Sequence, residues 1–131
     1  MKQSTLAIIG AVVIAGGMII LALFSVPSQK VNSQADGSNV SVIDGKQIVE
    51  IRAQGGYSPR TSLAKAGLPT TIRFKTDGAF DCSSAIRIQS LNISRQLART
   101  GNTDIDIGTQ SSGTLRGSCS MGMYPFEIKF Q

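Results

Sequence analysis

The sequence predicts an all-β domain behind an apolar N-terminal segment. From Lys46 to Gln131, apolar residues alternate with polar ones at a period of two, as in half-buried strands. Clusters of glycine, proline, asparagine and aspartate, which are typical of turns, separate these runs. Short strands at regular spacing are typical of an antiparallel β-sandwich or β-barrel. By contrast, Leu6 to Phe24 contains no charged residue.

Residues 1–26 are predicted to be an uncleaved transmembrane anchor. As a helix, Leu6 to Val26 would be roughly 30 Å long, which is the thickness of a bilayer core. This apolar run is longer than that of an ordinary signal peptide, and Phe24 disrupts the pattern of small residues expected at a cleavage site. An uncleaved signal segment is the alternative.

The charges around the anchor predict its orientation. Lys2 and the free amine precede the apolar run, whereas only Lys30 follows it closely. By the positive-inside rule, the N-terminus lies in the cytoplasm and the domain on the extracytoplasmic side of a single-pass membrane protein. Residues 27–45 are polar and rich in serine, asparagine and glutamine, which is typical of a flexible linker. Within them, Val40 to Ile43 is a candidate edge strand.

Residues 46–131 form the predicted domain, and five alternating runs predict its strands. The apolar members of these runs are Val49, Ile51 and Ala53; Ile72 and Phe74; Ile86 and Ile88; Ile105 and Ile107; and Phe126, Ile128 and Phe130. A domain of about 86 residues buries only one small core, so a metal or a disulfide would add substantially to its stability.

The composition excludes several classes of function. The chain has no histidine, which excludes Ser-His and Cys-His catalysis, His-ligated zinc and the His₂Cys blue-copper site. No nucleophile–base pair or phosphate-binding loop is present, so the chain is not expected to be an enzyme. The net charge of +5 comes from basic residues scattered singly, with few aromatic residues between them, which disfavours nucleic-acid binding.

The sulfur atoms are concentrated in one segment. Cys119, Met121 and Met123 stand at alternate positions, and Gly122 between the two methionines allows a tight turn. Together with Cys82 they hold all the sulfur outside the N-terminal segment. In an extended segment alternate side chains point the same way, so a thiolate and two thioethers are predicted to converge. Soft sulfur donors select Cu(I), which makes these four residues the candidate metal ligands.

Each of these residues has an alternative role. Cys82 and Cys119 can form a structural disulfide, worth roughly 3–4 kcal/mol on the chain-entropy model. Met121 and Met123 can fill gaps in the core. The disulfide and the metal site can also interchange, because two thiols that bind one ion are close enough to oxidise when the ion is absent.

Four segments, taken in order, resemble a known family. These are Gly56-Tyr57-Ser58-Pro59, Ala66-Gly67-Leu68-Pro69, Asp81-Cys82-Ser83-Ser84 and Cys119-Ser120-Met121-Gly122-Met123. Over residues 46–131 the chain resembles the bacterial cupredoxin-like domains that carry a Cys-x-Met-Gly-Met copper loop, often found beside copper-transport proteins. The resemblance implies a cupredoxin-like Greek-key β-sandwich.

The resemblance also implies roles for the four sulfur residues. Cys82 occupies the place of the first histidine ligand, and Cys119 matches the thiolate cysteine. Met123 matches the axial methionine, and Met121 stands near the second histidine position. Replacing both histidines with sulfur favours retention of Cu(I), with Ag(I) as an alternative cargo, over electron transfer.

The expected function is therefore copper sequestration or delivery. The expected partner is a copper transporter or a copper-receiving metalloprotein, and the chain contacts the membrane through its N-terminal helix. The alternative is a metal-free β-sandwich interaction module stabilised by a Cys82–Cys119 disulfide.

Overall fold

A computed structural model describes residues 39–131 of the chain. The predicted transmembrane helix and residues 27–38 of the predicted linker lie outside the described residues. Within residues 39–131, no helix is long and apolar enough to cross a membrane.

The described residues form an all-β fold, as the alternation predicts. Its strands are β1 (Val40–Ile43), β2 (Lys46–Ala53), β3 (Tyr57–Ser58), β4 (Thr61–Ala64), β5 (Pro69–Asp77), β6 (Ala85–Ile88), β7 (Ile93–Gln96), β8 (Thr100–Thr109), β9 (Gly113–Cys119) and β10 (Pro125–Phe130). Two short 3₁₀ turns, η1 (Cys82–Ser84) and η2 (Gln89–Leu91), flank β6.

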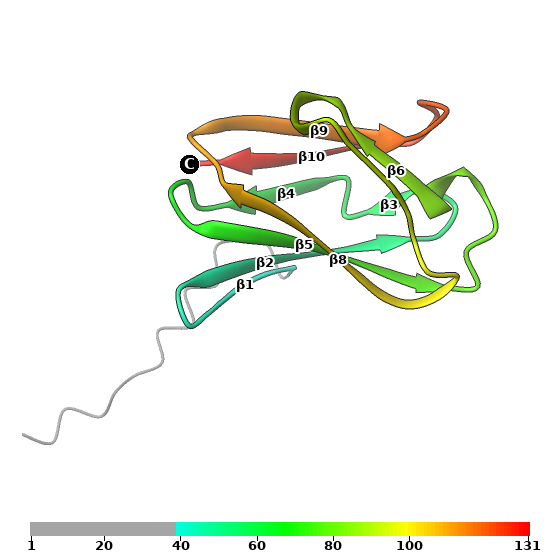
Figure 1. Cartoon of the computed structure of the whole chain (residues 1–131), viewed down its shortest axis with the longest axis horizontal. Coiled ribbons are helices and arrows are strands. Elements are labelled where there is room, and N and C mark those ends of the chain that lie inside the picture. The colour runs from blue at the N-terminus through cyan, green and yellow to red at the C-terminus, as the bar shows by residue number, and fades with distance from the viewer. Residues whose placement is uncertain (1–38) are drawn as a thin grey trace, which may run out of the picture. The chain divides into compact units, whose positions relative to one another are not determined.

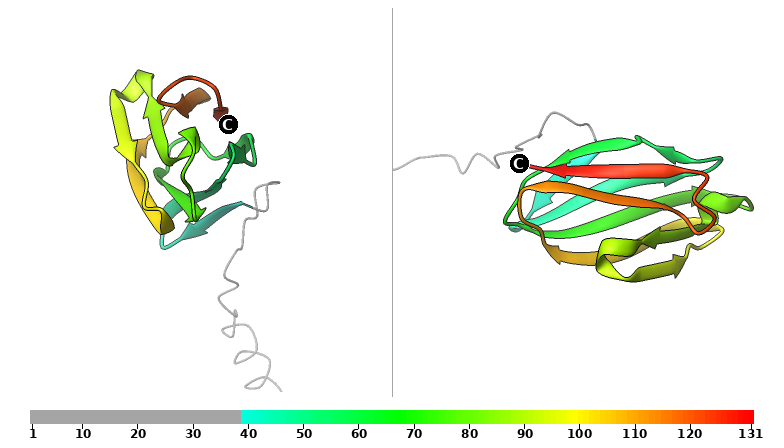
Figure 2. Two further views of the ribbon diagram at one scale, coloured as in Figure 1. Left: turned by 90° about the vertical axis from the view of Figure 1, so that its right-hand side faces the viewer. Right: turned by 90° about the horizontal axis from the view of Figure 1, so that it is seen from above.

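The strands form two sheets that pack as a sandwich (Figures 1 and 2). The β2 sheet has the order β1-β2-β5-β8, with β3 beside β2, and the β9 sheet has the order β4-β10-β9-β6-β7. Two neighbouring pairs, β2 with β5 and β4 with β10, are parallel. The expectation of a purely antiparallel sandwich is therefore wrong. The chain leaves β2, crosses to β4 in the other sheet and returns to β5 beside β2, which makes the β2–β5 pair parallel.

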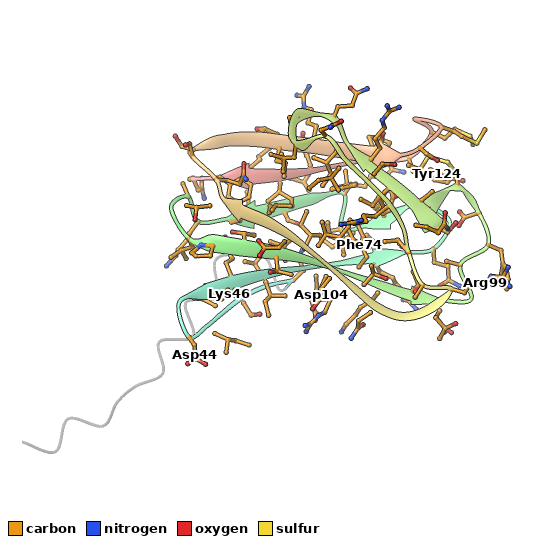
Figure 3. The ribbon with its side chains drawn as sticks, viewed as in Figure 1. Asp44, Lys46, Phe74, Arg99, Asp104 and Tyr124 are labelled. Carbon is orange, nitrogen blue, oxygen red and sulfur yellow. A yellow bond between two sulfur atoms is a disulfide. The ribbon has the colours of Figure 1, made fainter. Side chains whose placement is uncertain are left out.

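All five strands expected from the alternating runs are present, and their apolar residues face the core. In β2 and β5, Val49 lies opposite Ile72 and Ile51 opposite Phe74, and all four are buried. An aromatic cluster joins the two sheets. Tyr57 and Phe74 of the β2 sheet pack edge to face on Phe126 of the β9 sheet, with ring centroids 5.0 and 5.6 Å away. Phe74 is labelled between the sheets in Figure 3.

The candidate edge strand β1 is also present, within residues assigned to the linker. Val40 is buried and lies opposite Val49 of β2. Just before it, the Asn39 side-chain amide donates to the Ser62 hydroxyl of β4 at 2.7 Å. The chain therefore enters the fold where the edge strands of the two sheets, β1 and β4, come together.

Candidate metal centre

The Cys-x-Met-Gly-Met segment forms the tip of the hairpin between β9 and β10. Cys119 ends β9, and its N–H donates to the carbonyl oxygen of Tyr124 at 3.0 Å. The Gly122 N–H donates to the Cys119 carbonyl oxygen at 2.8 Å, which closes a tight turn. Gly122 has a φ of +75°, in the left-handed region that glycine adopts without a Cβ clash. The glycine therefore makes the turn that the sequence predicts.

Strand β6 holds the second cysteine beside this hairpin. Cys82 begins η1, and the chain runs from there directly into β6. In the β6–β9 pair, Ile86 lies opposite Cys119, and the Ser120 N–H donates to the Ala85 carbonyl oxygen at 2.9 Å. Because β6 is aligned with β9 in this register, η1 and Cys82 lie at the end of β9.

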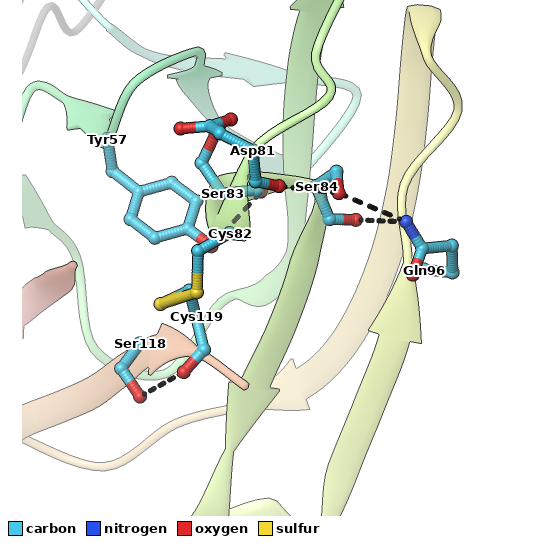
Figure 4. Close-up of a disulfide and its surroundings, with 8 residues drawn as sticks. All are labelled: Tyr57, Asp81, Cys82, Ser83, Ser84, Gln96, Ser118 and Cys119. Carbon is cyan, nitrogen blue, oxygen red and sulfur yellow. Dashed lines mark hydrogen bonds between the residues drawn. A yellow bond between two sulfur atoms is a disulfide. The ribbon is translucent and has the colours of Figure 1, made fainter. Parts of the chain in front are cut away.

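The two cysteines are joined by a disulfide (Figure 4). They are 37 residues apart in sequence, and their Cα atoms are 5.7 Å apart, the usual spacing for a disulfide. The Cys119 side chain is fully buried, whereas Cys82 is half-buried. The structure thus brings together the pair of residues that both the metal hypothesis and the disulfide alternative require.

The two methionines lie at the surface. Met121 is 75% exposed and Met123 is 60% exposed. This excludes the alternative in which they fill gaps in the core. It also corrects the expectation that the alternating sulfur atoms share one face, because Cys119 is buried in the same hairpin. The alternation of an extended strand ends at Cys119, where the turn begins.

Tyr57 lies beside the disulfide (Figure 4). Its hydroxyl donates to the carbonyl oxygen of Ser83, beside Cys82, at 3.2 Å (Figure 4). Burial, and to a smaller extent the negative charge of Asp81, raise the pKa of Tyr57 above its ordinary value. The phenol therefore stays neutral and donates this hydrogen bond at ordinary pH. In the sequence, Tyr57 stands out only as part of the Gly56-Tyr57-Ser58-Pro59 motif and as one of two tyrosines in a chain with few aromatic residues.

Asp81 holds η1 in place. One carboxylate oxygen, Oδ1, accepts from the Ser83 hydroxyl at 2.6 Å, and the Asp81 carbonyl accepts from the Ser84 N–H and hydroxyl. The other carboxylate oxygen, Oδ2, is buried and has no hydrogen-bond partner. A buried polar atom without a partner is uncommon in a folded protein. This one lies in the residue next to Cys82.

The donors near the cysteines fit a soft monovalent ion. Within residues 39–131, no three side chains of histidine, cysteine, aspartate or glutamate gather as they would around a harder ion. The chain has no histidine, so besides the carboxylate of Asp81 the donors in this region are the sulfur atoms of Cys82, Cys119, Met121 and Met123. Thiolate and thioether donors favour Cu(I).

Comparisons with known proteins identify relatives of this fold. A family model described as "Cupredoxin-like domain" matches residues 16–129. Comparison with curated protein sequences gives no significant match.

Two solved structures share the fold. The metal-binding domain of the Streptococcus pneumoniae D39 Cu(I)-exporting P-type ATPase CopA, solved with Cu(I), has a TM-score of 0.63 and 24% identity. That match covers 70% of this chain and 92% of that one. A copper-binding protein solved by NMR in its apo form has a TM-score of 0.66 and 20% identity, covering 72% of this chain and 97% of that one. At these identities the likeness shows the fold alone.

Proposed function

Because this chain belongs to the cupredoxin-like domain family, we propose that it is an extracytoplasmic Cu(I)-binding protein. It sequesters copper or delivers it to a copper transporter or a copper-receiving metalloprotein. One observation carries the proposal: the only two cysteines meet at the base of a hairpin whose tip exposes two methionines. The two similar structures support it, since each is a copper-binding domain by its own description.

Copper is the cargo of this site, and the reduced cysteines are its principal ligands. An external dithiol that reduces the Cys82–Cys119 bond supplies the two electrons and two protons, becomes a disulfide itself, and leaves two thiols in this chain. Each thiol loses a proton when it binds a metal, so binding releases protons. The thioethers of Met123 and Met121 complete the proposed ligand set. Ag(I), which is also soft and monovalent, is the alternative cargo.

The absence of histidine makes electron transfer the weaker assignment. Imidazole ligands support Cu(II), whereas thiolate and thioether ligands favour Cu(I). A site built from sulfur alone therefore stabilises one oxidation state, which suits storage and delivery. A carrier also needs accessible donors, and the exposed side chains of Met121 and Met123 meet that need.

The proposed location rests on the sequence. Residues 1–26 anchor the chain, and the domain lies on the extracytoplasmic side, as the apolar run and the flanking lysines indicate. Recovery of the chain in the membrane fraction with an intact N-terminus would support this location. A soluble form that begins shortly after the apolar run would contradict it.

Copper loading tests the function directly. The reduced full-length chain is expected to bind about one Cu(I), because four soft donors form one site. Addition of Cu(II) should give no intense visible band from thiolate-to-Cu(II) charge transfer. The measurements are the metal-to-protein ratio after gel filtration and the visible absorption spectrum. A stable blue protein would contradict the ligand assignment.

Substitution of the methionines tests their part in the site. Met123→Leu, and to a smaller degree Met121→Leu, is expected to weaken Cu(I) binding, because leucine supplies no donor. Both residues are exposed, so the free energy of unfolding should change by no more than about 0.5 kcal/mol. Cu(I) affinity is measured by competition with a chelator under reducing conditions.

A matched control is Ile43→Leu, which changes another exposed apolar residue, 57% exposed, on β1. It should leave Cu(I) affinity unchanged. If both methionine variants bind Cu(I) as tightly as the parent, the thiols alone form the site and the methionines are not ligands.

The disulfide favours a second candidate function. In this alternative the chain is a metal-free β-sandwich that binds another protein, and the Cys82–Cys119 bond only stabilises it. The two candidates differ after reduction: a Cu(I) carrier gains tight copper binding, whereas the interaction module only loses stability. Failure of the reduced chain to bind Cu(I) would favour the second candidate.

A further inference from the structure

The two sheets differ in charge. In the β2 sheet, the strands contain four basic residues, Lys46, Arg52, Arg73 and Lys75, and four acidic residues, Glu50, Asp77, Asp104 and Asp106. In the β9 sheet, the strands contain four basic residues, Arg87, Arg95, Arg116 and Lys129, and one acidic residue, Glu127. The strands of the β2 sheet are therefore neutral, whereas those of the β9 sheet carry a formal charge of +3.

Ion pairs neutralise much of the β2 sheet. The Arg73 guanidinium donates two hydrogen bonds of 2.8 Å to the Asp104 carboxylate on the neighbouring strand. The Lys75 ammonium lies 3.1 Å from a Glu50 carboxylate oxygen. Figure 3 shows Asp104 and Lys46 on the side of the sandwich that this sheet covers. Little unbalanced charge therefore remains on this side.

The cations of the β9 sheet gather on its outer face. Arg87, Arg116 and Lys129 are exposed and alternate with buried residues of β6, β9 and β10, so they point away from the core. Arg87 lies opposite Ser118, two residues from Arg116 along β9. The carboxylate oxygens of Glu127 lie 3.8 Å from Arg116 Nε and 3.5 Å from Lys129 Nζ, so both cations share a single carboxylate as their ion-pair partner.

A fourth cation joins the same face. Arg60, which precedes β4, lines an open groove of about 330 Å³ together with Arg116 and Glu127. Gly117 and Phe126 also line the groove. Two basic side chains and a single carboxylate therefore line one open groove, an arrangement that favours an anionic partner.

We propose that this outer face, defined by Arg60, Arg87, Arg116 and Lys129 and named here the basic face, lies against anionic lipid head groups. The proposal rests on the membrane anchor put forward under the proposed function. A Lys or Arg held near an anionic bilayer strengthens binding by about fivefold, so four such residues give a substantial effect even when one carboxylate offsets them.

The point of chain entry favours lipid as the occupant. Asn39 is bonded to Ser62 of β4 in the β9 sheet and to Glu50 of β2 in the other sheet, so the chain reaches the fold where the two sheets meet. Residues 27–38 separate this point from the predicted anchor, and the flexible linker that the sequence predicts for them would span roughly 20 Å on average. On the proposed function, the anchor therefore keeps a lipid surface close to the domain. A soluble acidic protein has no such advantage of proximity.

The experiment places the full-length chain in vesicles that contain a trace of lipid spin-labelled at the head group. One set of vesicles is phosphatidylcholine alone, and the other also contains phosphatidylglycerol. Backbone amide NMR signals of residues 87, 116 and 129 should broaden more in the anionic vesicles than those of residues 46 and 52. The difference should disappear between about 0.05 M and about 0.5 M salt, as the Debye length falls from roughly 14 Å to 4 Å.

Two double variants with the same change in net charge provide the control. Arg87→Glu with Arg116→Glu should remove the broadening caused by anionic lipid. Lys46→Glu with Arg52→Glu, on the neutral sheet, should retain it. Equal broadening of the two sheets, or the same broadening in neutral and anionic vesicles, would overturn the proposal. If the basic face shows no response to anionic lipid but binds a purified acidic protein, its partner is a protein and the proposal is wrong.

The same samples separate this proposal from the proposed function. Cu(I) affinity should be unchanged in both double variants, and a chain that binds no copper leaves the lipid result standing. A chain that does not sediment with neutral vesicles would show that the anchor is wrong. In that case, broadening of the β9-sheet signals in anionic vesicles still tests whether the basic face binds anionic lipid.

Discussion

Replacing Cys119 with serine is expected to lower Cu(I) affinity by at least about a hundredfold. The thiolate is a soft anionic ligand, whereas the serine hydroxyl is a hard and neutral one. Loss of a group that only supports a ligand already weakens metal binding by about 10–100-fold, so loss of a ligand itself should cost more. The measurement is competition with a Cu(I) chelator on the full-length chain under reducing conditions. Neither parent nor variant then contains the disulfide.

Two further variants make this result interpretable. Cys119 is fully buried, so its replacement can disturb folding, whereas Cys82 is half-buried and Cys82→Ser should cause the same loss of affinity in an intact fold. The neighbouring Ser120 is exposed, and Ser120→Ala should leave affinity unchanged. If both serine variants bind Cu(I) like the parent, the proposed site is wrong.

Reduction of the Cys82–Cys119 disulfide is expected to lower the free energy of unfolding by about 4 kcal/mol. The bond closes a loop between residues 37 apart in sequence, and the chain-entropy model gives this value for a loop of that length. For a domain of this size, the melting temperature should fall by roughly 15–25 °C. Thermal unfolding of the full-length chain with and without a reductant measures the change.

The double variant Cys82→Ala with Cys119→Ala serves as the control. It should unfold near the temperature of the reduced parent and show no response to reductant. Added Cu(I) should raise the melting temperature of the reduced parent, because a ligand that binds only the folded state stabilises it. The double variant should show no such rise. Equal melting of the oxidised and reduced parent would mean that the bond contributes nothing to folding.

Strands were predictable where apolar residues alternate, and were missed where the alternation has gaps. Strand β9 was missed because Leu115 is followed at the next inward position by Gly117, which has no side chain. The Phe126 ring of β10 occupies that space, and a Cβ at position 117 would overlap it. Strand β7 was missed for another reason: three of its four residues, Ser94 to Gln96, are exposed and show no alternation.

The sequence names candidate residues for the site but does not give their geometry. The composition gives the candidate sulfur ligands, the absence of histidine, and the possibility that Cys82 and Cys119 pair. The sequence did not determine that Met121 and Met123 are exposed while Cys119 is buried, because the strand pattern ends at the turn that Gly122 makes. Tyr57 and the partnerless oxygen of Asp81 beside the disulfide became evident only in the folded chain.

The local alternation with apolar neighbours predicts that Arg87 and Lys129 point outward, whereas Arg116 lies in β9, which the alternation missed. That the three cations share one face, and that Cys82 lies beside Cys119, is evident only in the folded chain. Both results depend on which strands become neighbours in a sheet. Strand pairing joins residues far apart in the chain, and the packing of the whole core selects it, so no local pattern encodes it.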